Sequence, residues 1–197
     1  MPNAGPLYSG TEVMTNKAVF LDRDGVINVD HGYVYRKEDF EFVDGIFEAC
    51  RYFQNNGYLL IVVTNQSGIA RGMYTEDDFQ ELTEWMVKRF REEGVEIAGV
   101  YHCPHHPDFG SEETKNCDCR KPKPGMIRQA IDDFDLDPGR CILIGDKTSD
   151  ALAGLAAGVG HSYLVSDKAA PEPGALAKTT RCTDLQGVID LLVSNNN

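Results

Sequence analysis

The chain has 197 residues, 42% hydrophobic and 25% charged, which is typical of one globular domain with its own core. Its 19 Lys and Arg against 31 Asp and Glu give a formal charge of −12, which disfavours nucleic acids and anionic membranes as partners. No apolar stretch is long enough to cross a membrane, and the first residues do not resemble a secretory signal. We therefore expect a cytoplasmic protein with reduced cysteines, a disordered leader over 1–16, a domain over 17–192 and a disordered tail over 193–197.

Four continuous apolar runs rich in Val and Ile predict strands that are covered on both faces, as in a parallel sheet. They span residues 18–21, 59–63, 141–144 and 159–165. Helical spacing of apolar residues, and one alanine-rich segment, predict helices within 46–53, 75–94, 124–134 and 150–157. Thr75, with Asp78 three residues later, predicts a capped start for the second of these helices. The alternation predicts an α/β fold with an open, doubly wound parallel sheet.

Polar residues follow three of the predicted strands at the point where each strand ends. They are Asp22 and Asp24 after the first strand, Thr64 and Asn65 after the second, and Asp146 and Lys147 after the third. Each pair taken alone is as typical of a turn or a helix cap as of a ligand site. Ligands of doubly wound sheets bind beyond the carboxyl ends of the strands, so the three pairs together predict a site at this edge.

The ordered motifs resemble the haloacid dehalogenase (HAD) superfamily of aspartyl phosphatases, which has a Rossmann-like core. The four motifs of that superfamily match residues 21–26, 63–65, 121–122 and 145–150. A phosphate monoester carries two negative charges, so attack by a carboxylate requires a cation that neutralises them. The resemblance implies Mg²⁺ held by Asp22, Asp146 and the backbone carbonyl of Asp24.

The same resemblance implies a role for each residue of the motifs. Asp22 would attack phosphorus, and Asp24 would protonate the leaving alcohol and then activate water. Thr64 and Lys121 would hold the phosphoryl oxygens. Asp150 would orient Lys147 or a metal-bound water.

A second motif, with metal-ligand spacing, lies between the second and third HAD motifs. Its candidate ligands, Cys103, His105, Cys117 and Cys119, form a Cys₃His set typical of closed structural zinc sites. Free thiols or a disulfide are the alternatives, and the expected reducing compartment disfavours the disulfide. His106 could take the place of His105 as a ligand. The remaining cysteines, Cys50, Cys141 and Cys182, are predicted to be small core residues.

Several loops resemble, more narrowly, the heptose 1,7-bisphosphate 7-phosphatase family, and histidinol-phosphate phosphatases share similar motifs. The resemblance rests on NVDHGY (28–33), TNQSGIARG (64–72), CRKPKPGM (119–126) and the zinc loop (103–119). It implies a small sugar bisphosphate as substrate, in the synthesis of lipopolysaccharide precursors. The implied substrate site contains Asp30, His31, Gly32, Tyr33, Thr64, Asn65, Gln66, Ser67, Arg120, Lys121 and Lys147.

The motif spacing leaves no room for a large cap domain, so specificity is expected to come from loops. A structural zinc next to Arg120 would fix that cation, which we expect to hold the second phosphate of the substrate, with Arg71 as another candidate. A phosphate-binding module without turnover would not need both Asp22 and Asp24, and a nucleic-acid phosphatase is disfavoured by the acidic charge. We expect a monomer, and the motifs do not define which sugar anomer is preferred.

Overall fold

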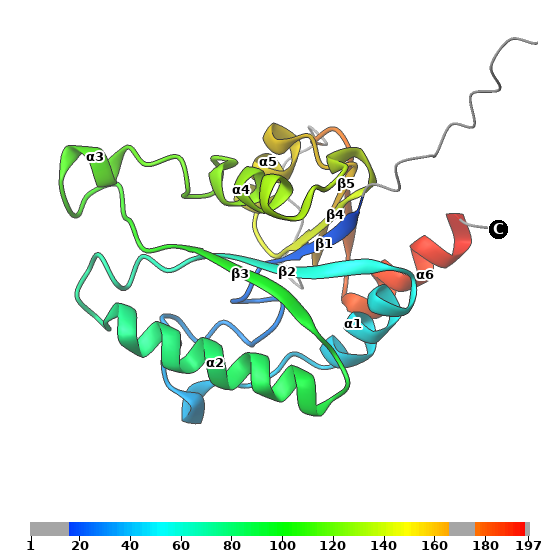
Figure 1. The fold of residues 1–197 in the computed structure, drawn as a ribbon, viewed down its shortest axis with the longest axis horizontal. Helices are drawn as coiled ribbons and strands as arrows, with labels where there is room; N and C mark the ends of the chain where they lie inside the picture. Colours follow the sequence, from blue (N-terminus) through cyan, green and yellow to red (C-terminus); the bar gives the residue numbers. More distant parts are fainter. Residues whose placement is uncertain (1–15, 166–175, 196–197) are drawn as a thin grey trace, which may run out of the picture.

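The computed structural model describes residues 16–165 and 176–195, and it contains one six-stranded sheet (Figure 1). All neighbouring strands run parallel, in the order β3-β2-β1-β4-β5-β6. The strands are β1 (Lys17–Leu21), β2 (Tyr58–Asn65), β3 (Ile97–Cys103), β4 (Ile142–Gly145), β5 (His161–Val165) and β6 (Thr179–Cys182). Residues 1–15 of the expected leader lie outside the described residues, whereas Asn16 pairs with Leu136.

Helices cover both faces of the sheet, which is the doubly wound arrangement expected from the sequence (Figure 1). One face carries α1 (Ile46–Asn55), α2 (Glu76–Glu92) and α6 (Leu185–Asn195), and the other carries α4 (Gly125–Phe134) and α5 (Thr148–Ala157). A short helix, α3 (Glu112–Lys115), lies in the loop after β3, and two 3₁₀ turns, η1 (Lys37–Asp39) and η2 (Pro138–Arg140), precede α1 and β4. Within the described residues, no helix is both long and apolar enough to span a membrane.

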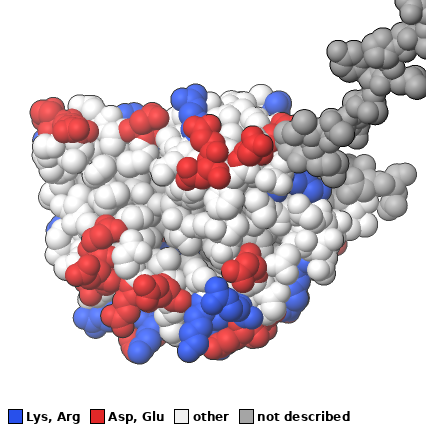
Figure 2. All heavy atoms as spheres, viewed as in Figure 1, with Lys and Arg blue, Asp and Glu red and all other residues white. Residues whose placement is uncertain are grey.

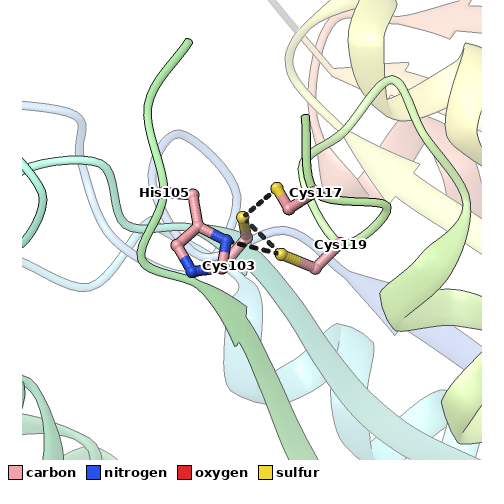
Figure 3. Close-up of side chains that lie close together, drawn as sticks. All are labelled: Cys103, His105, Cys117 and Cys119. Carbon is pink, nitrogen blue, oxygen red and sulfur yellow. Dashed lines mark hydrogen bonds between the residues drawn. The ribbon is translucent and has the colours of Figure 1, made fainter. Parts of the chain in front are cut away.

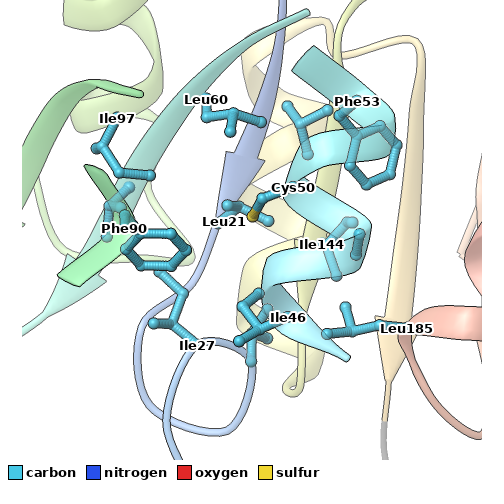
Figure 4. Packing of buried hydrophobic residues seen from close by; sticks show 14 of the residues in the cluster. Leu21, Ile27, Ile46, Cys50, Phe53, Leu60, Phe90, Ile97, Ile144 and Leu185 are labelled. Carbon is cyan, nitrogen blue, oxygen red and sulfur yellow. The ribbon is translucent and has the colours of Figure 1, made fainter. Parts of the chain in front are cut away.

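Two hydrophobic cores, one on each face of the sheet, hold the central strands in place. Val19 and Leu21 of β1 enter the core under α1, α2 and α6, and Ala18 and Phe20 enter the core under α4 and α5. Figure 4 shows the first core, where Leu21 and Leu60 lie close to Cys50 and Phe53. Burial of a large apolar side chain contributes about 1.5–3 kcal/mol, so these contacts fix the strand ends that carry the polar residues.

The start of α2 follows the expected capping pattern. The Thr75 hydroxyl accepts a hydrogen bond from the Asp78 N–H at 3.1 Å, and the Asp78 carboxylate accepts one from the Thr75 N–H at 2.7 Å. These reciprocal bonds pair two N–H groups that the first turn of a helix leaves without partners.

Two boundaries differ from the sequence prediction. Helix α5 begins at Thr148, ahead of the expected start at Asp150, and the Asp150 carboxylate accepts the N–H of the N-cap residue Lys147 at 3.0 Å. Helix α6 runs to Asn195, so residues 193–195 of the expected disordered tail are helical. The predicted strands do not include β3 or β6, and α6 is not predicted either. Both strands lie at the edges of the sheet, where β6 has one buried residue and β3 is buried only at its two ends.

The connections leave the carboxyl edge of the sheet uncovered by a further domain. Loops and η1 join β1 to α1, and the described residues contain no large cap, as expected. The three cysteines outside the zinc loop are buried within the two cores, also as expected: Cys50, Cys141 and Cys182.

Candidate active site

The sheet order brings the three polar strand ends together. Leu21, the last residue of β1, pairs with Val62 of β2 on one side and Ile144 of β4 on the other, so the residues that follow lie side by side. They surround a cleft of about 270 Å³ beyond the carboxyl ends of these strands. Its walls are formed by Asp22, Asp24, Asp30, Gly32, Tyr33, Asn65, Gln66, Ser67, Tyr74, Lys121, Lys147, Ser149 and Asp150.

A buried lysine lies at the floor of the cleft. Nζ of Lys121 is 2.9 Å from Asp22 Oδ1 and 2.6 Å from Asp150 Oδ1, and it donates a hydrogen bond to the Val63 carbonyl at 2.8 Å. Burial by itself would lower the pKa of Lys121, but the two carboxylates raise it above its ordinary value. The ammonium therefore stays charged beside Asp22.

The acidic residues around this lysine form a group that fits a divalent cation. Burial raises the pKa of Asp22 to about 7, and the nearby Lys121 opposes this shift. One carboxylate oxygen from each of Asp22, Asp146 and Asp150 lies within 4.8 Å of the others. Oδ1 of Asp146 is buried and has no hydrogen-bond partner. Three clustered carboxylates, one of which has a buried oxygen without a hydrogen-bond partner, are the ligand chemistry of a hard cation such as Mg²⁺.

The carboxylate of Asp24 is held by donors on both of its oxygens. The Arg23 guanidinium donates to Oδ1 at 2.9 Å and to Oδ2 at 3.0 Å, Asn28 donates to Oδ1 at 3.1 Å and Gln66 donates to Oδ2 at 3.0 Å. Arg23 is only 2% exposed and also donates to the Val34 carbonyl at 2.7 Å. The sequence analysis assigns no role to Arg23 or Asn28, because a sequence motif does not show which groups their side chains contact.

Asn65 joins the end of β2 to the loop that carries Lys121. Its side-chain oxygen accepts the Lys121 N–H at 3.1 Å, and its amide nitrogen donates to the Lys121 carbonyl at 3.1 Å. The peptide bond between Lys121 and Pro122 is cis. Asn65 therefore lines the cleft and also fixes the backbone of the lysine.

Three residues that the resemblance places in the substrate site do not line the cleft. His31 lies at the surface, where Nε2 is 3.1 Å from a Glu41 carboxylate oxygen. Thr64 is fully buried behind the wall. The Arg120 guanidinium points to the zinc loop and donates to the His105 carbonyl at 3.1 Å.

Other residues of the cleft differ from the sequence analysis in detail. Tyr74 and Ser149 line it although no motif includes them. Lys147 Nζ lies 3.2 Å from Asp30 Oδ2 and 3.3 Å from Asp146 Oδ2. The Asp150 carboxylate accepts the Lys147 N–H at 3.0 Å and lies 2.6 Å from the Lys121 ammonium, so it contacts the backbone of Lys147 and the side chain of Lys121.

The four candidate zinc ligands converge beside the end of β3 (Figure 3). Sγ of Cys103 is 3.7 Å from Sγ of Cys117, Sγ of Cys119 is 3.4 Å from Nδ1 of His105, and the Cys119 and Cys103 sulfurs are 2.7 Å apart. The first two distances match the edges of about 3.5–3.8 Å expected around tetrahedral zinc. His106 lies outside this group, and its Nδ1 accepts the Asp108 N–H at 3.1 Å.

The three thiols of the group differ in their electrostatics, since burial raises the pKa of Cys103 and of Cys119. Burial would raise the pKa of Cys117, but hydrogen bonds with His105 and Cys119 lower it to about 7. All three sulfurs of the group are free thiols, so none of them is used in a disulfide. A thiol that ionises near neutral pH is prepared to act as a thiolate ligand.

Comparisons with known proteins agree with this geometry. The HAD-hydrolase-like family model matches residues 118–184. The chain is 54% identical over 153 residues to a D-glycero-beta-D-manno-heptose-1,7-bisphosphate 7-phosphatase of Vibrio cholerae, covering 77% of this chain and 82% of that one. It is also 54% identical over 155 residues to a D-glycero-alpha-D-manno-heptose-1,7-bisphosphate 7-phosphatase of Campylobacter jejuni, covering 79% and 86%. A D,D-heptose 1,7-bisphosphate phosphatase of B. bronchiseptica, solved with magnesium and phosphate, has a TM-score of 0.79, 28% identity and coverage of 91% and 99%.

Proposed function

Because the chain belongs to the D-glycero-D-manno-heptose-1,7-bisphosphate 7-phosphatase family, we propose that it removes the 7-phosphate of heptose 1,7-bisphosphate. It is a phosphoric monoester hydrolase of the HAD type. The observation that carries the proposal is the buried Asp22–Lys121 pair at the floor of a cleft whose walls are the loops of this family.

In this proposal Asp22, Asp146 and the backbone carbonyl of Asp24 hold Mg²⁺. The unpartnered, buried oxygen of Asp146 supports the site, since a buried carboxylate oxygen without a donor is costly unless a cation binds it. The related B. bronchiseptica structure contains magnesium and phosphate. When bound, Mg²⁺ neutralises the charge of the phosphate and stabilises the charge that develops during transfer.

The residues of the chain then perform two displacement steps. The Asp22 carboxylate attacks phosphorus and forms an acyl phosphate, while the Asp24 carboxyl gives its proton to the departing sugar oxygen. Asp24, now a carboxylate, takes a proton from water, and that water displaces the phosphate from Asp22. The Lys121 ammonium, 2.9 Å from Asp22 Oδ1, is placed to hold the transferring phosphoryl oxygens.

We further propose that Cys103, His105, Cys117 and Cys119 bind a structural Zn²⁺. Four ligands complete the tetrahedral shell and leave no open position for chemistry. Arg120 follows Cys119 directly, and its guanidinium is bonded to the carbonyl of His105. Zinc would therefore fix the position of the Arg120 side chain, which precedes the catalytic Lys121 in the sequence.

The partner proposed is a small sugar bisphosphate, bound by a monomeric enzyme in the cytoplasm. The free thiols of the zinc loop suit a reducing compartment. The net charge of −12 does not favour nucleic acid, and Figure 2 shows Lys and Arg side chains interspersed with Asp and Glu on the face in view.

A comparison of substrates tests the proposed function. We expect kcat/KM for heptose 1,7-bisphosphate, measured with each anomer, to exceed that for histidinol phosphate by at least about tenfold, equivalent to about 1.4 kcal/mol. Lys147 on the cleft wall offers a cation for the distal phosphate, whereas the amine of histidinol phosphate gains nothing from it. Equal kcat/KM values for the two substrates would reject the assignment.

Gly25→Ala is expected to weaken activation by Mg²⁺ at least about tenfold. A Cβ at position 25 would lie 2.6 Å from Asp146 Oδ2, so the carboxylate must move. Gly94→Ala is the matched control, because Gly94 shares the positive φ but has nothing within 4 Å of an added Cβ. The Mg²⁺ concentration for half-maximal phosphate release measures the effect, and an unchanged value for Gly25→Ala would count against Asp146 as a ligand.

A further inference from the structure

The side-chain amide of Gln66 occupies a central place in the wall of the cleft. Gln66 is 1% exposed, and its nitrogen donates to Asp24 Oδ2 at 3.0 Å and to Thr64 Oγ1 at 2.8 Å. Its oxygen accepts a hydrogen bond from the Tyr74 hydroxyl at 2.6 Å. Both amide protons are therefore used within the protein, and neither is left to bind a substrate.

Chemistry fixes which way this amide faces. The Asp24 carboxyl group accepts hydrogen bonds from Arg23 and Asn28, and the nitrogen of Gln66 faces it as a further donor. Burial raises the pKa of Tyr74 to about 12, so the phenol keeps its proton and donates to the amide oxygen. The Tyr74 ring is held in turn by stacking on Tyr35, with centroids 5.2 Å apart and planes 8° from parallel.

The amide also links two strand ends of the site. Asp24 follows β1, whereas Thr64 is in β2, and Gln66 is the side chain that bonds to both. Because Thr64 accepts from Gln66, its own hydroxyl proton remains available for another acceptor, and no described residue takes it. Among the bonds to Asp24 Oδ2, Gln66 supplies the one from the β2 side and Arg23 supplies the other.

We propose that Gln66, anchored by Tyr74, is a positioning residue that orients the carboxyl of Asp24 for proton transfer, and is not a substrate ligand. The proposal rests on the proposed phosphatase function and on the role of Asp24 as acid. It differs from the role that the resemblance implies for Gln66, which is contact with the sugar bisphosphate. If the Asp24 carboxyl is misplaced, a sugar alcohol leaves more slowly, because it needs a proton from that acid. The acidic 4-nitrophenol leaves as its anion, so its departure is almost unchanged.

The test compares two leaving groups. In Gln66→Met, which keeps a similar volume without an amide, we expect the ratio of kcat/KM for heptose 1,7-bisphosphate to kcat/KM for 4-nitrophenyl phosphate to fall at least about tenfold. Tyr74→Phe, which removes only the anchoring hydroxyl, should lower the ratio about threefold, in the same direction. Tyr35→Phe is the control and should leave it unchanged.

Binding to an Asp22→Asn background separates positioning from substrate contact. The Kd for heptose bisphosphate should be the same, within about twofold, for Asp22→Asn and for the double variant Asp22→Asn, Gln66→Met. An unchanged kcat/KM ratio would overturn the proposal, and so would clearly weaker binding, which would make Gln66 a substrate ligand. If heptose 1,7-bisphosphate is not the substrate, the wild type will not hydrolyse it. The kcat/KM ratio can then be measured with any alkyl phosphate that the wild type does hydrolyse, so the two failures are distinguishable.

Discussion

Asp22→Asn should reduce phosphate release by at least about 10⁴-fold, because it removes the nucleophile and keeps the shape of the side chain. The change should leave the fold intact, since Lys121 retains Asp150 at 2.6 Å and the Val63 carbonyl at 2.8 Å as partners. Phosphate release at saturating substrate and Mg²⁺ measures the loss. Thermal unfolding and zinc content check that the variant is native.

The matched control for this variant is Asp77→Asn. Asp77 is an exposed residue in the first turn of α2, away from the cleft, so its variant should keep wild-type turnover. If Asp22→Asn retained turnover within about tenfold of the wild type, Asp22 could not be the nucleophile and the proposed reaction would be wrong.

Cys117→Ser should abolish stoichiometric zinc binding and lower the midpoint of thermal unfolding by at least about 5 °C. Its thiol has a pKa lowered to about 7, whereas a serine hydroxyl stays protonated and is a poor zinc ligand. The proposed ion would join β3 to the loop before Lys121, so its loss should also reduce phosphate release. Metal analysis of the purified protein and thermal unfolding measure the two effects.

Cys182→Ser is the control for zinc content. Cys182 is buried in the core at the end of β6, far in sequence from the zinc loop, so this variant should keep its zinc. A Cys117→Ser protein with a full complement of zinc would contradict the assignment, as would a wild-type protein purified without any.

The central strands and the capped helices could be predicted from the sequence because their signals are local. The continuous apolar runs 18–21 and 59–63 need cover on both faces, and Thr75 and Asp78 bond to each other within one turn. Parallel pairing then brings the residues after neighbouring strands to one edge, so the location of the cleft also follows. The edge strands β3 and β6 lack such a run, which is why neither is among the predicted strands.

The orientation of side chains could not be predicted, because it depends on contacts between distant segments. The spacing of the zinc loop permits either His105 or His106 as a ligand, and only the folded chain places His105 beside the three sulfurs. Arg120 has a motif position beside Lys121, but its guanidinium turns to the His105 carbonyl. Tyr74 carries no motif signal, since its role depends on packing around Gln66.

The most direct test of the central claim is to follow the reaction with heptose 1,7-bisphosphate by ³¹P NMR in the presence of Mg²⁺. The proposed function predicts that the resonance of the C7 phosphate decays with formation of inorganic phosphate, while the anomeric C1 phosphate persists. The reaction should stop when Mg²⁺ is chelated. Loss of the C1 resonance first, or no change in either resonance, would contradict the assignment of this protein as a 7-phosphatase.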